Sequence, residues 1–151
     1  YADRMTNYML WLMESAVTRV VLEQWYIDGV SCLSSHRKKQ EFGREVFFAM
    51  DPKGDNCPIK LSDLTFEMFS DYLNQLKPKR QRKGVKSEMM SAGMYDSNKS
   101  GLMYMFKMSK YGAPTADFIR ELRLYIGGLK RNVSDDQYSS DMSSSTLSKL
   151  C

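Results

Sequence analysis

The first 26 residues carry apolar side chains close to the 3.6-residue period of an α-helix. These are Met5, Tyr8, Met9, Leu12, Ala16, Val20 and Leu22, and the segment contains neither glycine nor proline. The β-branched residues of the segment VTRVV at 17–21 lower helix propensity, because their side chains lose rotamer freedom against the preceding turn. The pattern therefore predicts one or two helices, with a break near Ser15 to Thr18.

The following part of the chain is more polar and contains turn residues. Gly29 predicts the end of the preceding helix, and residues 31–44 are polar and basic, which is typical of an exposed helix leading into 46–48. The segment DPKGDNCP at 51–58 contains two prolines and a glycine and predicts a loop. We therefore expect residues 30–61 to form a long insertion after the first helix, that is, a connection of about 30 residues before the next strongly amphipathic helix.

Three further helices are predicted, each preceded by a residue that can cap its amino terminus. Thr65 caps a helix to about residue 76, Asp96 or Ser97 caps one to about 111, and Thr115 caps the last. The apolar residues that follow one face of each are Phe66, Phe69, Tyr72, Leu73 and Leu76; Leu102, Met105 and Phe106; and Phe118, Leu122, Tyr125, Ile126 and Leu129. Each helix can therefore bury one face in a shared core.

These elements predict an all-α fold. Apolar and polar residues do not alternate with period two over any window longer than about four residues, so no strand is clearly signalled. We expect a small bundle of four to six helices within a domain covering 1–133. Residues 134–151 are rich in serine and aspartate and have little apolar mass to pack, so they predict a disordered tail or linker.

Composition excludes several classes of protein. A chain of 151 residues can build one hydrophobic core, and its three cysteines, widely spaced and without a C-x-x-C pair, favour a reducing compartment over a disulfide framework or thiolate zinc site. The single histidine, His36, lies in a basic run without an orienting carboxylate, so we expect no metal, no other cofactor and no small-molecule substrate.

The apolar run 8–13 is far shorter than the ~20 residues of a membrane span. The start at Tyr1 indicates a piece of a longer protein.

The charge is distributed unevenly along the chain. Residues 1–76 hold 8 basic and 11 acidic side chains, whereas 77–132 hold 13 basic and 4 acidic ones, a net charge of +9. The densest part is a basic linker at 77–88, with six cations between Lys77 and Lys86. Such a run favours a polyanionic partner, nucleic-acid phosphate above all; a nuclear import signal and a solvated linker are the alternatives.

The order of these pieces resembles a known family. A first helix with Tyr8 and a Trp11-Leu12 pair precedes the segments LTFEMFSDYLNQL at 64–76, YDSNKSGLMYMF at 95–106 and FIRELRLYIGGLKR at 118–131. This arrangement resembles the amino-terminal, SAM-like core-binding domain of tyrosine recombinases and phage-type integrases, most closely the integrase-like proteins of eukaryotic Crypton-type mobile elements. The insertion at 30–61 and the density of the basic linker depart from that family.

The resemblance implies a helical domain that forms half of a clamp around duplex DNA, with catalysis in a separate domain. The recombinase pattern of an arginine, a His-x-x-Arg pair and a late tyrosine cannot be assembled here, since lysine stands at position 39 after His36, so we expect no enzymatic activity in this piece. The implied partners are double-stranded DNA and other protomers of a recombinase assembly, with no membrane, in the nucleus or another intracellular compartment.

Charge and resemblance together nominate DNA-contacting residues. In the basic linker these are Lys77, Lys79, Arg80, Arg82, Lys83 and Lys86, and on the two last helices Lys99, Lys107, Lys110, Arg120 and Arg123. Two alternative functions stay open. One is a helical protein-interaction module with a methionine-rich surface and a nuclear-import run. The other is a binder of single strands or RNA, which would need exposed aromatic rings beside the cations.

Overall fold

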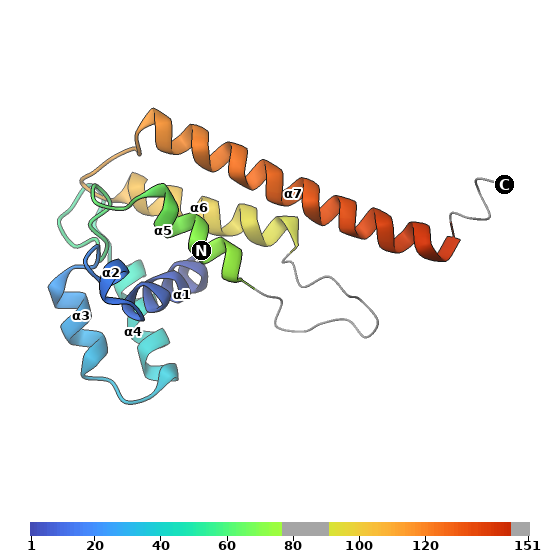
Figure 1. The fold of residues 1–151 in the computed structure, drawn as a ribbon. Coiled ribbons are helices and arrows are strands. Elements are labelled where there is room, and N and C mark those ends of the chain that lie inside the picture. The colour runs from blue at the N-terminus through green and yellow to red at the C-terminus, as the bar shows by residue number, and fades with distance from the viewer. Residues whose placement is uncertain (77–90, 146–151) are drawn as a thin grey trace.

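A computed structural model describes residues 1–76 and 91–145, with side chains for 1–76 and 91–132. The helices are α1 (Ala2–Met13), α2 (Ala16–Arg19), α3 (Gln24–Ser31), α4 (His36–Phe48), α5 (Phe66–Gln75), α6 (Ala92–Met108) and α7 (Ala116–Ser145), as Figure 1 shows. Within these described ranges β-pairing is limited to two isolated bridges, Leu22 with Ile59 and Gly54 with Ser109. The all-α prediction is confirmed.

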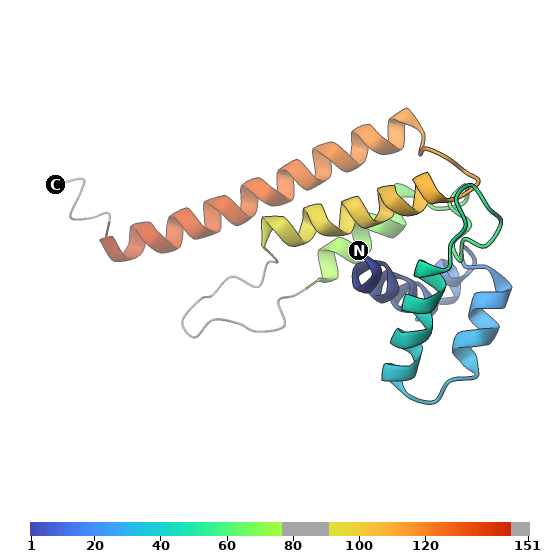
Figure 2. The ribbon, with the colours of Figure 1, turned by 180° about the vertical axis from the view of Figure 1, so that it is seen from behind.

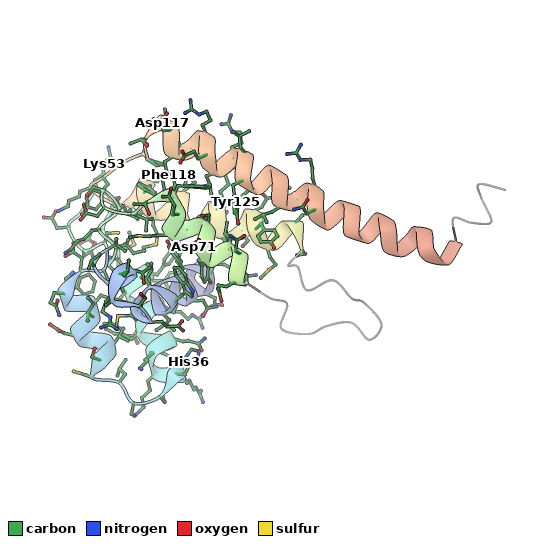
Figure 3. All side chains as sticks on the ribbon, viewed as in Figure 1. His36, Lys53, Asp71, Asp117, Phe118 and Tyr125 are labelled. Atoms are coloured by element: carbon green, nitrogen blue, oxygen red, sulfur yellow. The ribbon has the colours of Figure 1, made fainter. Side chains whose placement is uncertain are left out.

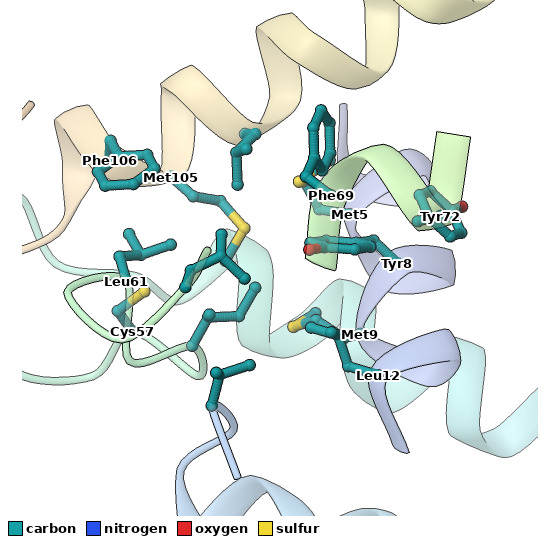
Figure 4. Packing of buried hydrophobic residues seen from close by; sticks show 14 of the residues in the cluster. Met5, Tyr8, Met9, Leu12, Cys57, Leu61, Phe69, Tyr72, Met105 and Phe106 are labelled. Carbon is teal, nitrogen blue, oxygen red and sulfur yellow. The ribbon is translucent and has the colours of Figure 1, made fainter. Parts of the chain in front are cut away.

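Helix α1 lies at the centre of the bundle, between α4 and α6. Its buried residues Met5, Met9 and Leu12 are fully enclosed, and Tyr8 packs edge-on against Phe69 of α5 with ring centroids 5.2 Å apart. Figure 4 shows this cluster continuing through the side chains of α6 and of the loop before α5. The core thus joins segments far apart in the sequence.

Four helix starts are fixed by side-chain caps. The hydroxyl oxygens of Thr65 and Thr115 accept hydrogen bonds from the backbone N–H groups of Met68 (3.3 Å) and Phe118 (3.2 Å), so both predicted caps are confirmed. Ser15 caps α2 in the same way, and its extended backbone produces the predicted break after α1. The fourth cap is Ser35, before α4.

Two predicted boundaries are wrong, for identifiable reasons. Gly29 lies inside α3 rather than at its end; a Cβ there would stand 2.5 Å from the ring of Phe42, so this glycine allows α3 and α4 to approach closely. Helix α6 begins at Ala92, four residues before the expected cap at Asp96. Asp96 instead pairs with Lys130, and Ser97 accepts a hydrogen bond from Arg4, so these polar residues make tertiary contacts and cap nothing.

The predicted insertion at 30–61 belongs to the core. It contributes Val30, Phe47 and Ile59 to the buried cluster, and α4 packs along α1. This packing explains why the described ranges hold seven helices, where four to six were expected.

Helix α7 is the longest element and extends beyond the other helices, in both views of the ribbon (Figures 1 and 2). The composition predicts a disordered tail from 134, whereas the helical backbone continues to Ser145. No glycine or proline follows Gly128, so the sequence contains no residue that would end the helix there. The expectation for 146–151 lies outside the described residues.

The packing of α1 on α4 can be tested with a glycine pair. A Cβ at Gly43 would stand 2.6 Å from the methyl carbon of Thr6, which is itself buried, whereas a Cβ at Gly127 would meet open space. We therefore expect Gly43→Ala to lower the free energy of unfolding by about 1–3 kcal/mol. Gly127→Ala should raise it by about 0.5–1 kcal/mol through helix propensity. Urea denaturation measures both, and destabilisation of equal size by the two variants would contradict this packing.

The buried tyrosines predict a loss of stability at alkaline pH. Burial raises the pKa of Tyr72 from 10.0 to about 12, and burial also raises the pKa of Tyr8 well above its ordinary value. The folded chain therefore keeps these protons where the unfolded chain loses them, so their stabilising effect is complete below pH 10 and falls as the pH rises toward 12. Tyr72→Phe should make the free energy of unfolding, measured at intervals over this range, fall less steeply. An unchanged slope would contradict the buried phenol.

Candidate nucleic-acid interface

One face of α7 is fixed against the bundle. Phe118, Leu122 and Ile126 are buried, and Phe118 lies against Phe106 of α6 with ring centroids 6.0 Å apart. Tyr125 donates a hydrogen bond to the side chain of Asn74 at the end of α5. These contacts fix the rotation of α7 about its axis, so the opposite face must point to solvent.

That outer face is cationic. Because successive helical residues turn by about 100°, four positions fall within about 60° of one another on the side away from the buried residues. We call these positions, Arg120, Leu124, Gly127 and Arg131, the outer stripe; Arg123 lies beside it. Arg120, Arg123 and Arg131 are exposed, and Figure 3 shows nitrogen-tipped side chains rising from this edge of α7. Arg131 follows Arg120 by 11 residues, which corresponds to about 16 Å along the axis.

The nominated lysines of α6 lie on the neighbouring helix. Helices α6 and α7 run in opposite directions, since Phe106 meets Phe118 at one end and Asp96 pairs with Lys130 (2.9 Å) at the other. Lys107 is exposed and Lys99 is half-buried. The structure therefore places Lys99, Lys107, Arg120 and Arg123 on two adjacent antiparallel helices.

Two nominated cations are partly neutralised by the chain's own acids. Lys110 pairs with Asp55 at 3.6 Å and also lies over the ring of Tyr111, and Arg120 pairs with Asp117 at 3.0 Å. Each of these ion pairs is largely exposed, with side-chain exposures of 50% and 89% in the first and 69% and 77% in the second. Exposed pairs contribute at most about 1 kcal/mol, so a phosphate can compete for either cation.

The six nominated cations of the basic linker, Lys77, Lys79, Arg80, Arg82, Lys83 and Lys86, lie outside the described residues. The segments on either side of the linker are described, and both lie beside α7. Asn74, just before it, contacts Tyr125, and Asp96, shortly after it, pairs with Lys130. The described segments that flank the linker in sequence therefore both contact α7, at Tyr125 and Lys130.

Sequence reasoning missed two features of this surface. Arg131 belongs to the outer stripe, and Leu124 lies exposed within it, with 68% of its surface accessible. The sequence did contain a signal for both residues, because Leu124 follows Arg120 by four residues and Arg131 follows Leu124 by seven, which is helical spacing. A second basic group, the sequence HRKK at 36–39, opens α4 on the far side of the bundle from α7, where Figure 3 labels His36; its first three residues are exposed and Lys39 is half-buried.

Other chemistry has little support in this structure. Within 1–76 and 91–132, no three histidine, cysteine or acidic side chains are close enough together to hold a metal ion. Burial raises the pKa of the Cys57 thiol to about 11, so it is protonated and unreactive at neutral pH. No helix among the described residues combines the length and apolar content needed to cross a bilayer.

Comparison with known proteins identifies no relative. The chain matches no model of a protein family, no curated protein and no solved structure.

The outer face of α7 should be dispensable for folding. The side chains of Arg120, Arg123 and Arg131 are exposed, and the one ion pair among them is a surface pair. Replacing all three by glutamine, which retains helix propensity, should change the free energy of unfolding by no more than about 0.5 kcal/mol. The thermal unfolding midpoint should therefore shift little. Thermal denaturation followed by circular dichroism measures this change. A large drop in the midpoint would mean that these side chains support the bundle.

Proposed function

We propose that this chain binds duplex DNA, and that the outer face of α7 makes the central phosphate contacts. The observation that carries the proposal is the placement of three exposed arginines on the one face of α7 that the bundle leaves free. Their spacing along a helix of fixed orientation matches a regularly charged polymer better than a small anion. A flexible basic tail could also attract a polyanion, but it would not hold its cations at fixed positions as α7 does.

Electrostatics supplies the driving force. Duplex DNA carries about one charge per 1.7 Å of axis, so each phosphate neutralised by a lysine or arginine releases condensed counterions. Lys99 and Lys107 add cations on the neighbouring helix α6, and the basic linker adds six more in sequence. Such contacts position the protein on the duplex, while side chains that reach the groove would read sequence.

We place this activity in the non-catalytic, core-binding portion of a tyrosine-recombinase-like protein acting in DNA recombination or integration in the nucleus. The order of the helices supports this assignment, with the Trp11-Leu12 pair on α1 and the segments 64–76, 95–106 and 118–131 covering or lying within α5, α6 and α7. The missing catalytic residues would then belong to another domain of the parent protein.

The protein-interaction alternative receives less support from the packing. The methionines that suggested an adaptable surface are mostly engaged: Met105 is fully buried, and Met94, Met103 and Met108 pack partly against the core. They fill irregular space between helices, as flexible thioethers commonly do.

Salt dependence of binding tests the proposed function. In fluorescence-anisotropy titrations of a labelled random duplex, log K should fall with log salt concentration with a slope of about −6 or steeper. Replacing Arg120, Arg123 and Arg131 by glutamine should flatten that slope by about 2.7, because each lost phosphate contact removes about 0.9. Replacing Lys79, Arg80, Arg82 and Lys83 should flatten it by about 3.6.

The matched control removes three cations from the other basic surface, Arg37, Lys38 and Lys39 of α4, which should leave the slope unchanged. Absence of binding at low salt would refute the proposal. Equal effects of the α4 and α7 variants would refute the location, because nonspecific attraction would then suffice.

A further inference from the structure

Leu124 is an exposed apolar residue that lies between two arginines of the outer stripe. Its side chain is 68% exposed, Arg120 lies one turn before it on the outer stripe, and Arg131 lies two turns after it. Isolated exposed leucines are common and need no explanation. A leucine centred on the cationic face of a rigid helix is different, because any polyanion that neutralises those arginines must also cover it.

The shape of α7 around Leu124 fits a DNA groove. The major groove is about 12 Å wide and admits an α-helix, whose diameter with side chains is about 10–12 Å. Gly127 carries no side chain, and a Cβ built there or at Gly128 meets nothing within 4 Å. The backbone beyond Leu124 can therefore approach the bases closely, while Arg120 and Arg131 stand about 16 Å apart along the axis, far enough to reach the phosphates at the edges of the groove.

The acidic neighbours of this surface do not occupy its centre. Asp117 and Glu121 are exposed on one flank of the outer stripe, and Asp117 is paired with Arg120. Between residues 117 and 131 the chain carries four cations, completed by Arg123 and Lys130, against these two acids. The net charge of the helix surface therefore still favours a polyanion.

From this arrangement, and resting on the proposed function, we infer that Leu124 reads thymine in the major groove. The thymine C5-methyl group is the apolar feature that distinguishes A·T pairs there, and an apolar side chain contacts it favourably. Leu124 has no polar atom with which to read any other base edge. It gives the protein a preference for sites with thymine beneath the middle of α7.

Replacement of thymine by uracil tests this role without changing phosphates or base pairing. Wild-type protein should bind a thymine duplex about fourfold more tightly per contacted methyl than the same sequence with uracil throughout, because burying one such group contributes about 0.8 kcal/mol. Leu124→Ala should bind both duplexes equally, and Leu124→Met, which keeps an apolar side chain of similar size, should retain the preference. Any effect of uracil on duplex stiffness cancels when the thymine-to-uracil affinity ratio of Leu124→Ala is compared with that of the wild-type protein.

Val17→Ala provides the matched control, since Val17 is also exposed (72%) but lies on α2, and this variant should keep the wild-type preference. Salt-dependent binding of wild-type protein with equal affinity for both duplexes would overturn the role of Leu124 and leave the proposed function standing. Persistence of the thymine preference in Leu124→Ala would also overturn it. Failure to bind either duplex would refute the proposed function itself.

Discussion

Helix α7 buries one face against α5 and α6, and the direction of its exposed side chains follows from that contact. Phe118, Leu122 and Ile126 are enclosed by the bundle, and the hydrogen bond from Tyr125 to Asn74 ties the middle of α7 to the end of α5. A helix fixed on one side has no freedom to turn, so its remaining side chains keep a constant direction. The same apolar packing that stabilises the fold therefore aligns the arginines.

Competition between the chain's own acids and an external polyanion sets how strongly that face can act. Lys110, Arg120 and Lys130 each pair with a carboxylate within the described residues. These pairs are at least partly exposed, so each contributes at most about 1 kcal/mol and leaves its cation open to an external anion. The internal acids therefore reduce the charge of the cationic surface without neutralising it.

Helical periodicity and capping chemistry made much of this fold predictable. The caps at Thr65 and Thr115 and the buried faces of α5, α6 and α7 follow from local spacing, which a single sequence displays directly. Gly29 was misread because its role depends on Phe42, a residue distant in sequence. The charge of the candidate interface was predictable, but its geometry was not. Arg131 and Leu124 join Arg120 on one face only once the orientation of α7 is known, and tertiary packing sets that orientation.

Backbone amide shifts measured by NMR during titration with a short duplex would show which surface meets DNA. We expect perturbations to concentrate on residues 120–131 of α7 and on the exposed side of α6, with little change at 36–39 of α4. Perturbations centred on the start of α4, with α7 unaffected, would rule out α7 as the binding surface, because the basic residues of α4 would then contact the duplex.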